Sequence, residues 1–273
     1  MVLDGRFRLQ SLVGEGGLSA VYRAQDGERG DAAAVKIFHA ITAGLPDVRR
    51  RWRREAELCR MLGSPTGAAL RGHGLHDGRP WLAFDYLDGA TLREWRGQRA
   101  VPAGEGVSLA QRLLELVAAV HALRVAHRDL KPTNVMRLGD GKLRLVDLGA
   151  ALPFGERPAR DLVAGTAAYG APEQLAGEAA DPRGDLYSVG VMLFELLCGQ
   201  RPFQGDPMVL LDAHARLPPP RARALVPSLS TALDELVDKA LAKRPEARYA
   251  SAQAMQAALA AVPEATPDPG GPR

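Results

Sequence analysis

The feature that most constrains this chain is the octapeptide at residues 127–134, which reads HRDLKPTN. It places an acid, a cation and an amide on one short segment. Asp129 can accept a hydroxyl proton, Lys131 can neutralise charge on a moving phosphoryl group, and Asn134 can bind a divalent cation through its amide oxygen. Because magnesium prefers several oxygen ligands, a second donor is required, and Asp147 is the candidate.

Taken one at a time, these residues are better explained as a polar turn. The complete string, however, resembles the catalytic loop of protein kinases, and its lysine is typical of the serine/threonine branch. The resemblance implies an α+β, bilobal protein-kinase-like fold, with a small antiparallel sheet and one helix in the N-lobe and a mainly helical C-lobe. The lobes are expected at residues 1–88 and 89–262, followed by a disordered tail, rich in Pro and Gly, at residues 263–273.

The overall composition is that of a folded domain. With 273 residues, 46% of them hydrophobic, the chain can bury a full core. Its 35 basic and 32 acidic residues give a net charge of +3, which is too balanced to indicate nucleic-acid binding. The basic run at residues 49–54 reads as the solvated start of a helix.

The two cysteines, Cys59 and Cys198, lie far apart without a metal-ligand spacing, so neither a disulfide framework nor a zinc site is expected. No apolar run reaches the roughly 18 residues that a membrane span requires, and residues 1–10 lack the apolar core of a signal peptide. A cytoplasmic location is therefore expected. The oligomeric state is left open between a monomer and a homodimer.

Near the start of the chain, apolar residues at 7–13 and 18–24 predict two strands joined by a glycine-rich turn. Gly14 and Gly16 of this turn would let backbone N–H groups approach phosphate oxygens closely. A glycine cluster at a hairpin tip is ordinary, however, and is weak evidence by itself.

A lysine in the middle of an apolar strand, Lys36 within residues 34–38, follows this hairpin. Such a lysine either extends toward solvent or faces an anion, and the preceding glycines favour the anion. The strand is similar to the kinase strand whose lysine contacts the α- and β-phosphates of ATP and pairs with a helical glutamate. A helix is predicted at residues 47–62. By resemblance Glu55, in the string RREA, is the preferred partner, and Glu57 is the alternative.

Two more strands, at residues 70–74 and 81–87, complete the predicted sheet. The kinase resemblance places Phe84 beside an adenine pocket, although a core position explains this residue equally well. It also implies backbone hydrogen bonds to adenine from Asp85, Tyr86 and Leu87. The apolar side chains expected to sandwich the purine are Val13, Val21 and Ala34.

A strongly periodic helix at residues 109–123 leads to the catalytic loop, and a hairpin at 135–146 places Asp147 just beyond a strand end. The motif Asp147, Leu148, Gly149 replaces the more familiar Asp-Phe-Gly of kinases. Leu148 keeps an apolar plug and Asp147 keeps the carboxylate, so the change does not indicate inactivation. Further helices are predicted at 208–216, 231–242 and 251–262.

The string at residues 165–173, GTAAYGAPE, resembles the end of a kinase activation segment. Thr166 matches the threonine that contacts the catalytic aspartate and lysine, which implies Ser or Thr acceptors. Glu173 needs a buried cationic partner, because a lone desolvated carboxylate is costly, and Arg248 matches that partner. Asp185 matches the aspartate that braces the catalytic-loop backbone.

The residues between Asp147 and Gly165 include no Ser, Thr or Tyr. In kinases with an arginine before the catalytic aspartate, here Arg128, a phosphorylated activation segment often neutralises that arginine. We therefore expect activity that does not depend on phosphorylation of this segment. Asp161 first and Glu156 second are candidates to face Arg128, and solvation of both acids is an equal alternative.

Together the motifs imply an ATP-dependent protein kinase of the bacterial Hanks type, acting on Ser and Thr of protein substrates with Mg²⁺ or Mn²⁺. The implied catalytic residues are Lys36, Glu55, Asp129, Lys131 and Thr166. The implied nucleotide-binding residues are Val13, Gly14, Gly16, Val21, Ala34, Lys36, Phe84, Asp85, Leu87 and Asn134. The implied metal ligands are Asn134 and Asp147. A nucleotide-binding pseudokinase scaffold is the alternative, but its usual mark, a lost catalytic or metal residue, is not found.

Overall fold

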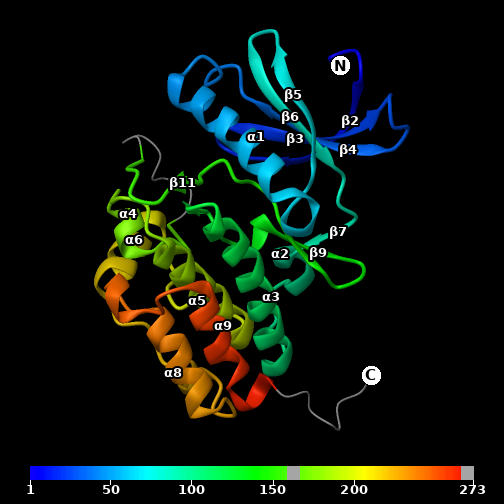
Figure 1. The fold of residues 1–273 in the computed structure, drawn as a ribbon. Coiled ribbons are helices and arrows are strands. Elements are labelled where there is room, and N and C mark those ends of the chain that lie inside the picture. The colour runs from blue at the N-terminus through cyan, green and yellow to red at the C-terminus, as the bar shows by residue number, and fades with distance from the viewer. Residues whose placement is uncertain (159–166, 266–273) are drawn as a thin grey trace. The chain divides into compact units, whose positions relative to one another are not determined.

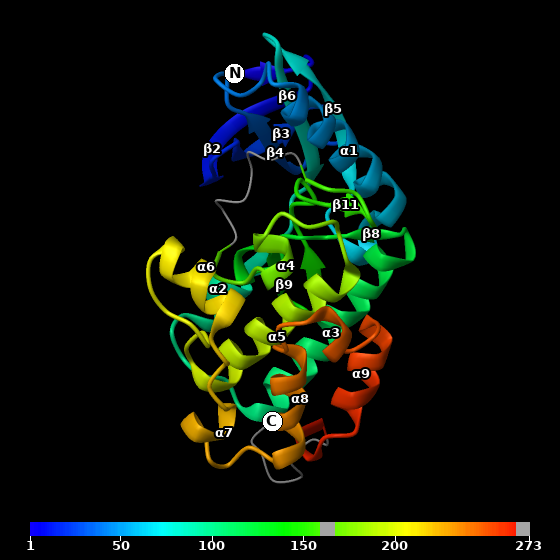
Figure 2. The same ribbon diagram turned by 90° about the vertical axis from the view of Figure 1, so that its left-hand side faces the viewer.

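The computed structural model describes residues 1–158 and 167–265, and the chain divides into two compact units (Figures 1 and 2). The first unit comprises residues 1–89 and 136–150, and the second comprises residues 90–135 and 151–273. The chain was expected to divide once, after residue 88. Instead it returns to the first unit after the catalytic loop, so residues 136–150, with Asp147, cluster with the N-terminal sheet.

The first unit is built on a six-stranded antiparallel sheet with one long helix, which Figure 1 shows in blue and cyan. The strand order is β1-β2-β3-β4-β6-β5. The strands are β1 (Val2–Leu3), β2 (Phe7–Glu15), β3 (Ser19–Asp26), β4 (Ala32–Phe38), β5 (Leu70–His76) and β6 (Arg79–Asp85). The other elements are the helix α1 (Pro46–Thr66) and the strands β9 (Val135–Leu138) and β10 (Leu143–Leu145).

Alternation along the strands gives this sheet two apolar faces. One face carries a buried cluster that includes Phe7 and Val35, and the other packs Leu82 against Trp52 of α1. The helix therefore covers one face. It extends beyond its predicted end, but Gly63 has a φ of 65°, so the regular helix stops where the sequence predicts and a further turn follows.

The second unit is mainly helical. Helix α5 is buried along nearly its whole length and packs against α3 and α8, while α3 packs against α9 (Figure 2). The helices are α2 (Leu92–Arg96), α3 (Ala103–Ala122), α4 (Pro172–Leu175), α5 (Pro182–Cys198), α6 (Pro207–Arg216), α7 (Ala222–Leu225), α8 (Thr231–Ala240) and α9 (Ala252–Ala260). The short elements are β7 (Gly89–Thr91), β8 (Val125–Ala126), β11 (Leu152–Pro153), η1 (Pro132–Asn134), η2 (Pro245–Ala247) and η3 (Pro263–Ala265).

Capping residues define where these helices begin. The carboxylate of Asp181 accepts a hydrogen bond from a backbone N–H of α5, and Asp206 does the same for α6. Ser230 and Ser251 cap α8 and α9 in the same way. Helix α5 ends at Gly199, whose φ of 75° is the left-handed conformation that favours glycine.

The expected disordered tail is wrong for residues 263–265. These residues form η3, and the carboxylate of Glu264 accepts hydrogen bonds from the backbone N–H (2.6 Å) and the hydroxyl (2.8 Å) of Ser230. A composition rich in Pro and Gly predicts the end of regular helix, but it does not reveal an anchor that is distant in sequence. Residues 266–273 lie outside the described part of the chain.

The predicted ion pair between Glu173 and Arg248 is confirmed. The guanidinium donates from Nη1 to Oε1 at 2.7 Å and from Nη2 to Oε2 at 2.8 Å, and both residues are buried. Arg248 also donates to the carbonyls of Arg183, Ala242 and Lys243. This one side chain therefore ties α4 to the loop before η2 and to the first turn of α5. Across residues 1–158 and 167–265, no helix has the length and apolarity to cross a membrane.

We expect Arg248→Met to lower the free energy of unfolding by about 3–5 kcal/mol, because it leaves the Glu173 carboxylate buried without its cation. Urea denaturation measures the change. Arg244→Met is the matched control: Arg244 is 84% exposed and pairs with Glu246 at 3.7 Å, so its loss should cost less than about 1 kcal/mol. Equal losses in the two variants would contradict the assignment.

Candidate active site

The first unit gathers three charged side chains from distant parts of the sequence. Lys36 lies in β4, Glu55 in α1 and Asp147 just after β10. The Lys36 ammonium donates to Glu55 Oε1 at 2.8 Å, to Glu55 Oε2 at 2.9 Å and to Asp147 Oδ1 at 2.7 Å. Glu57, the alternative partner, is exposed. The ion pair predicted between Lys36 and Glu55 is thus present.

Burial governs the electrostatics of this cluster, since Lys36 is 8% exposed and Glu55 is 1% exposed. Burial alone would lower the pKa of Lys36, but the charges of Asp147 and Glu55 outweigh it and raise that pKa. Burial raises the pKa of Glu55 to about 7, opposed by Lys36 and reinforced by the negative charge of Asp147. The cluster therefore holds a charged lysine between two acids that compete for it.

The residues that follow Asp147 are shaped around this cluster. Asp147 itself has a φ of 71°, and its Oδ1 accepts a hydrogen bond from the backbone N–H of Gly149 at 3.0 Å. A Cβ at Gly149 would lie 3.0 Å from Asp147 Oδ1 and 3.2 Å from Glu55 Oε2. Lack of space therefore explains the glycine, a requirement that the sequence motif alone did not reveal. Leu148 is 6% exposed, as its predicted plugging role requires.

The second unit brings together the polar residues of the catalytic loop. The Lys131 ammonium donates to Asp129 at 2.8 and 3.0 Å. The amide nitrogen of Asn134 donates to the Asp129 carboxylate at 2.8 Å and to the Asp129 carbonyl at 2.9 Å. Because its nitrogen faces Asp129, the amide presents its oxygen to the other side. That orientation fits a cation ligand.

The backbone of this loop is held in an unusual conformation. Arg128 has a φ of 66°, which is costly for a residue with a Cβ. The buried carboxylate of Asp185 accepts hydrogen bonds from the backbone N–H groups of His127 and Arg128, both at 2.8 Å. The side-chain amide of Gln174 donates to the Arg128 carbonyl. The predicted bracing by Asp185 is confirmed, and Gln174 is a positioning residue that the sequence did not reveal.

Residues predicted to bind the nucleotide line up across the sheet of the first unit. Gly14 is opposite Val21, Val21 is opposite Lys36, and Ala34 is opposite Phe84. Paired residues point to the same face, so these side chains share the face that α1 covers. Phe84 packs against the buried cluster on that face, as expected of a core residue.

Other predicted residues surround this row. Gly16 closes the β2–β3 turn by donating its N–H to the Ser19 carbonyl at 2.9 Å, and Val13 is 57% exposed on β2. Asp85 ends β6, and Leu87 follows in the connection to β7. Thr166 and Asp161 lie outside the described residues. Glu156 is exposed, and its backbone pairs with Ala180 and Pro153.

The predicted metal ligands, Asn134 and Asp147, belong to different units. Each fits such a role on its own terms: Asn134 by the orientation of its amide, and Asp147 because its side chain is 43% exposed. Within the described part of the chain, no cluster of three or more His, Cys, Asp or Glu side chains could hold a metal.

Comparison with known proteins decides the family. The family model described as the protein kinase domain matches residues 7–259. The chain belongs to the protein kinase family. Its relatives are bacterial serine/threonine kinases, and the α+β kinase fold expected from the catalytic-loop string is confirmed.

Serine/threonine-protein kinase Pkn1 of Myxococcus xanthus is 36% identical to this kinase domain over 263 residues, which are 93% of this chain and 38% of Pkn1. Serine/threonine-protein kinase PknL of Mycobacterium tuberculosis is 37% identical over 268 residues, which are 96% of this chain and 67% of PknL. The crystal structure of the Mycobacterium tuberculosis PknI kinase domain superimposes with a TM-score of 0.75 at 27% identity. The match covers 94% of this chain and 96% of that one.

The raised pKa of Glu55 predicts a pH-dependent stability for the kinase domain. Its folded pKa of about 7 lies above the ordinary value of 4.5, so the unfolded chain loses this proton first as the pH rises. The associated stability is complete below pH 4.5 and is lost as the pH approaches 7. Relative to Glu55→Gln, which cannot ionise, the wild type should lose up to about 3 kcal/mol of unfolding free energy across this window.

Urea denaturation at a series of pH values measures this difference. Glu57→Gln serves as the control, because Glu57 lies two residues further along the same helix. Its side chain is exposed and outside the cluster. It should follow the wild type at every pH. A wild-type stability that rises relative to Glu55→Gln over this window would contradict the assignment.

Proposed function

We propose that this chain is the catalytic domain of a serine/threonine protein kinase, which transfers the γ-phosphate of ATP to Ser or Thr hydroxyls of protein substrates. The observation that carries the proposal is the Asp129 carboxylate, held between the Lys131 ammonium and the Asn134 amide. The similarity to Pkn1 and PknL, both serine/threonine-protein kinases by name, supports it.

Each group has a defined part in the proposed reaction. Asp129 orients the acceptor hydroxyl and takes its proton, while Lys131 stabilises charge on the transferred phosphoryl group. Lys36, held by Glu55, contacts the α- and β-phosphates. Thr166 is proposed to contact the catalytic aspartate and lysine. The distance of 2.8 Å between the Lys131 ammonium and the Asp129 carboxylate supports the roles proposed for these two residues.

The proposed cofactor is Mg²⁺, with Mn²⁺ as a substitute, held by Asn134 and Asp147. When bound, the ion neutralises negative charge on the phosphates of ATP. The proposed adenine site uses backbone groups of Asp85 and Leu87, with apolar contacts from Val13, Val21, Ala34 and Phe84. Gly14 and Gly16 offer backbone N–H groups to the phosphates.

Asp129→Asn should lower kcat by at least about 100-fold, because the amide keeps the shape of the side chain but cannot take a proton. ATP binding should change little. A radiolabel assay with a generic protein substrate, with and without Mg²⁺, measures the rate, and displacement of a fluorescent nucleotide measures binding.

Asp140→Asn is the matched control for this experiment. Asp140 lies in the exposed turn between β9 and β10, where it pairs with Lys142, and its variant should retain full activity. Undiminished phosphate transfer by Asp129→Asn would refute its role as the base. A wild-type protein that binds ATP but transfers no phosphate would instead indicate a pseudokinase scaffold.

We also propose that activity does not require phosphorylation of the activation segment. The chain offers no hydroxyl side chain between Asp147 and Gly165. Protein treated with a phosphatase should therefore keep its initial rate, with mass spectrometry verifying that phosphate is absent. A rate that collapses on this treatment, and recovers with phosphate on Thr166 or Tyr169, would contradict the proposal.

A carboxylate is proposed to take the place of the phosphate opposite Arg128. If Asp161 does so, Asp161→Ala should lower kcat more than Glu156→Ala in the same assay. Unchanged activity in Asp161→Ala would exclude that residue, and a larger loss in Glu156→Ala would move the role to Glu156.

A further inference from the structure

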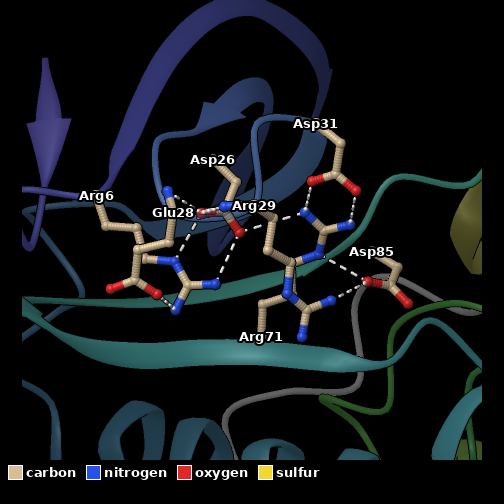
Figure 3. A network of polar contacts seen from close by, with 7 residues as sticks. All are labelled: Arg6, Asp26, Glu28, Arg29, Asp31, Arg71 and Asp85. Atoms are coloured by element: carbon tan, nitrogen blue, oxygen red, sulfur yellow. Dashed lines mark hydrogen bonds and ion pairs between the residues drawn. The ribbon is translucent and has the colours of Figure 1, made fainter.

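A network of charged residues in the first unit lies outside the proposed catalytic groups (Figure 3). At its centre is Arg71 of β5, whose side chain is 5% exposed. Its guanidinium donates to three carboxylates: Nε to Asp85 at 2.7 Å, Nη1 to Asp26 at 3.3 Å and Nη2 to Asp31 at 2.9 Å. A single arginine thus joins the end of β3, the β3–β4 turn and the end of β6.

The network is anchored at Asp26, whose side chain is fully buried. Arg6 donates to this carboxylate from Nε at 2.7 Å and from Nη2 at 2.8 Å, and the backbone N–H of Glu28 donates at 3.1 Å. The hydrogen bonds from Arg6 outweigh burial and hold the pKa of Asp26 far below its ordinary value. Asp26 is therefore a buried negative charge that Arg6 and Arg71 share, and Arg71 has separate hydrogen bonds to Asp85 and Asp31.

The other end of the network is Asp85, the last residue of β6. Its backbone is paired with Ala33 of β4, and its N–H donates to the Ala69 carbonyl at 2.9 Å. Strand pairing of β6 ends here. Residues 86–88 then run without strand pairing, so Asp85 is the last point at which the sheet holds this segment. The guanidinium of Arg23 lies 5.0 Å from the ring centroid of Tyr86, the next residue.

We propose that Arg71 is a positioning residue for nucleotide binding, which fixes the Asp85–Leu87 backbone in the conformation that bonds adenine. The inference rests on the proposed function, since that function places adenine at this segment. Arg71 touches no nucleotide group in this scheme. It acts through Asp85, and a backbone that samples the binding conformation for only a tenth of the time would bind about tenfold more weakly.

The chain offers a matched pair of variants. Arg71→Met and Arg6→Met each remove one cation from the buried Asp26, so both should lower the melting temperature. Arg71 also contacts Asp85, whereas Arg6 forms ion pairs with Asp26 and Glu28. A purely structural role predicts the same binding behaviour in both variants, and a positioning role separates them.

Binding is measured by calorimetry with three probes: ATP, adenosine and inorganic tripolyphosphate. In Arg71→Met the Kd for ATP and adenosine should rise about tenfold, while the Kd for tripolyphosphate should stay within about twofold of wild type. The KM for ATP should rise in parallel with little change in kcat at saturating ATP. In Arg6→Met all three Kd values should remain those of the wild type.

Equal weakening in both variants, unchanged adenosine binding in Arg71→Met, or a matching loss of tripolyphosphate affinity would each overturn the inference. If Arg71→Met does not fold, Asp85→Asn weakens the same contact from the other side and should raise the Kd for adenosine without affecting tripolyphosphate. Failure of the proposed function is recognised separately, because the wild type would then bind no ATP or transfer no phosphate.

Discussion

The first unit depends on pairing charges where water cannot reach them. The Lys36 ammonium is nearly fully buried, and it keeps its charge because two carboxylates lie within 2.9 Å. Meeting that requirement brings a strand, a helix and the segment after β10 to one point. The buried carboxylate of Asp26 imposes the same requirement on the opposite part of the sheet, where Arg6 and Arg71 satisfy it. Burying either charge without its partners would cost several kcal/mol.

The second unit is organised by a backbone constraint. The catalytic loop passes through a positive φ at Arg128, and both backbone polar groups of that residue are held: the N–H by Asp185 and the carbonyl by Gln174. His121 in turn contacts the Asp185 carboxylate at 2.8 Å. A strained loop of this kind persists when its surroundings determine it fully. Arg128 therefore contributes to the shape of the loop through its backbone, independently of any partner of its side chain.

The spacing of apolar residues predicted most of the long helices and strands, but it did not predict the short ones. The helices α3, α6 and α8 and the strands around Lys36 follow from apolar spacing. The two-residue strands β8 and β11 are too short to show any period, and they form because their partners lie beside them. Helix α2 was not predicted, although the sequence contains its capping box. Thr91 and Glu94 exchange hydrogen bonds at its first turn. The ordered structure of residues 263–265 was not predicted, because their hydrogen-bond partner, Ser230, is distant in sequence.

The sequence by itself determined the family and the residue types at the proposed site, because each motif specifies its chemistry within a few residues. Through the kinase resemblance it also predicted the pairs Lys36–Glu55 and Glu173–Arg248. It could not distinguish Arg71 or Gln174 from solvated surface residues. The three carboxylates around Arg71 lie 14, 40 and 45 positions away, the partner of Gln174 lies 46 positions away, and no local pattern signals such contacts. Only the tertiary structure decided these roles, since it is folding that removes water from a guanidinium or an amide and makes its partner obligatory.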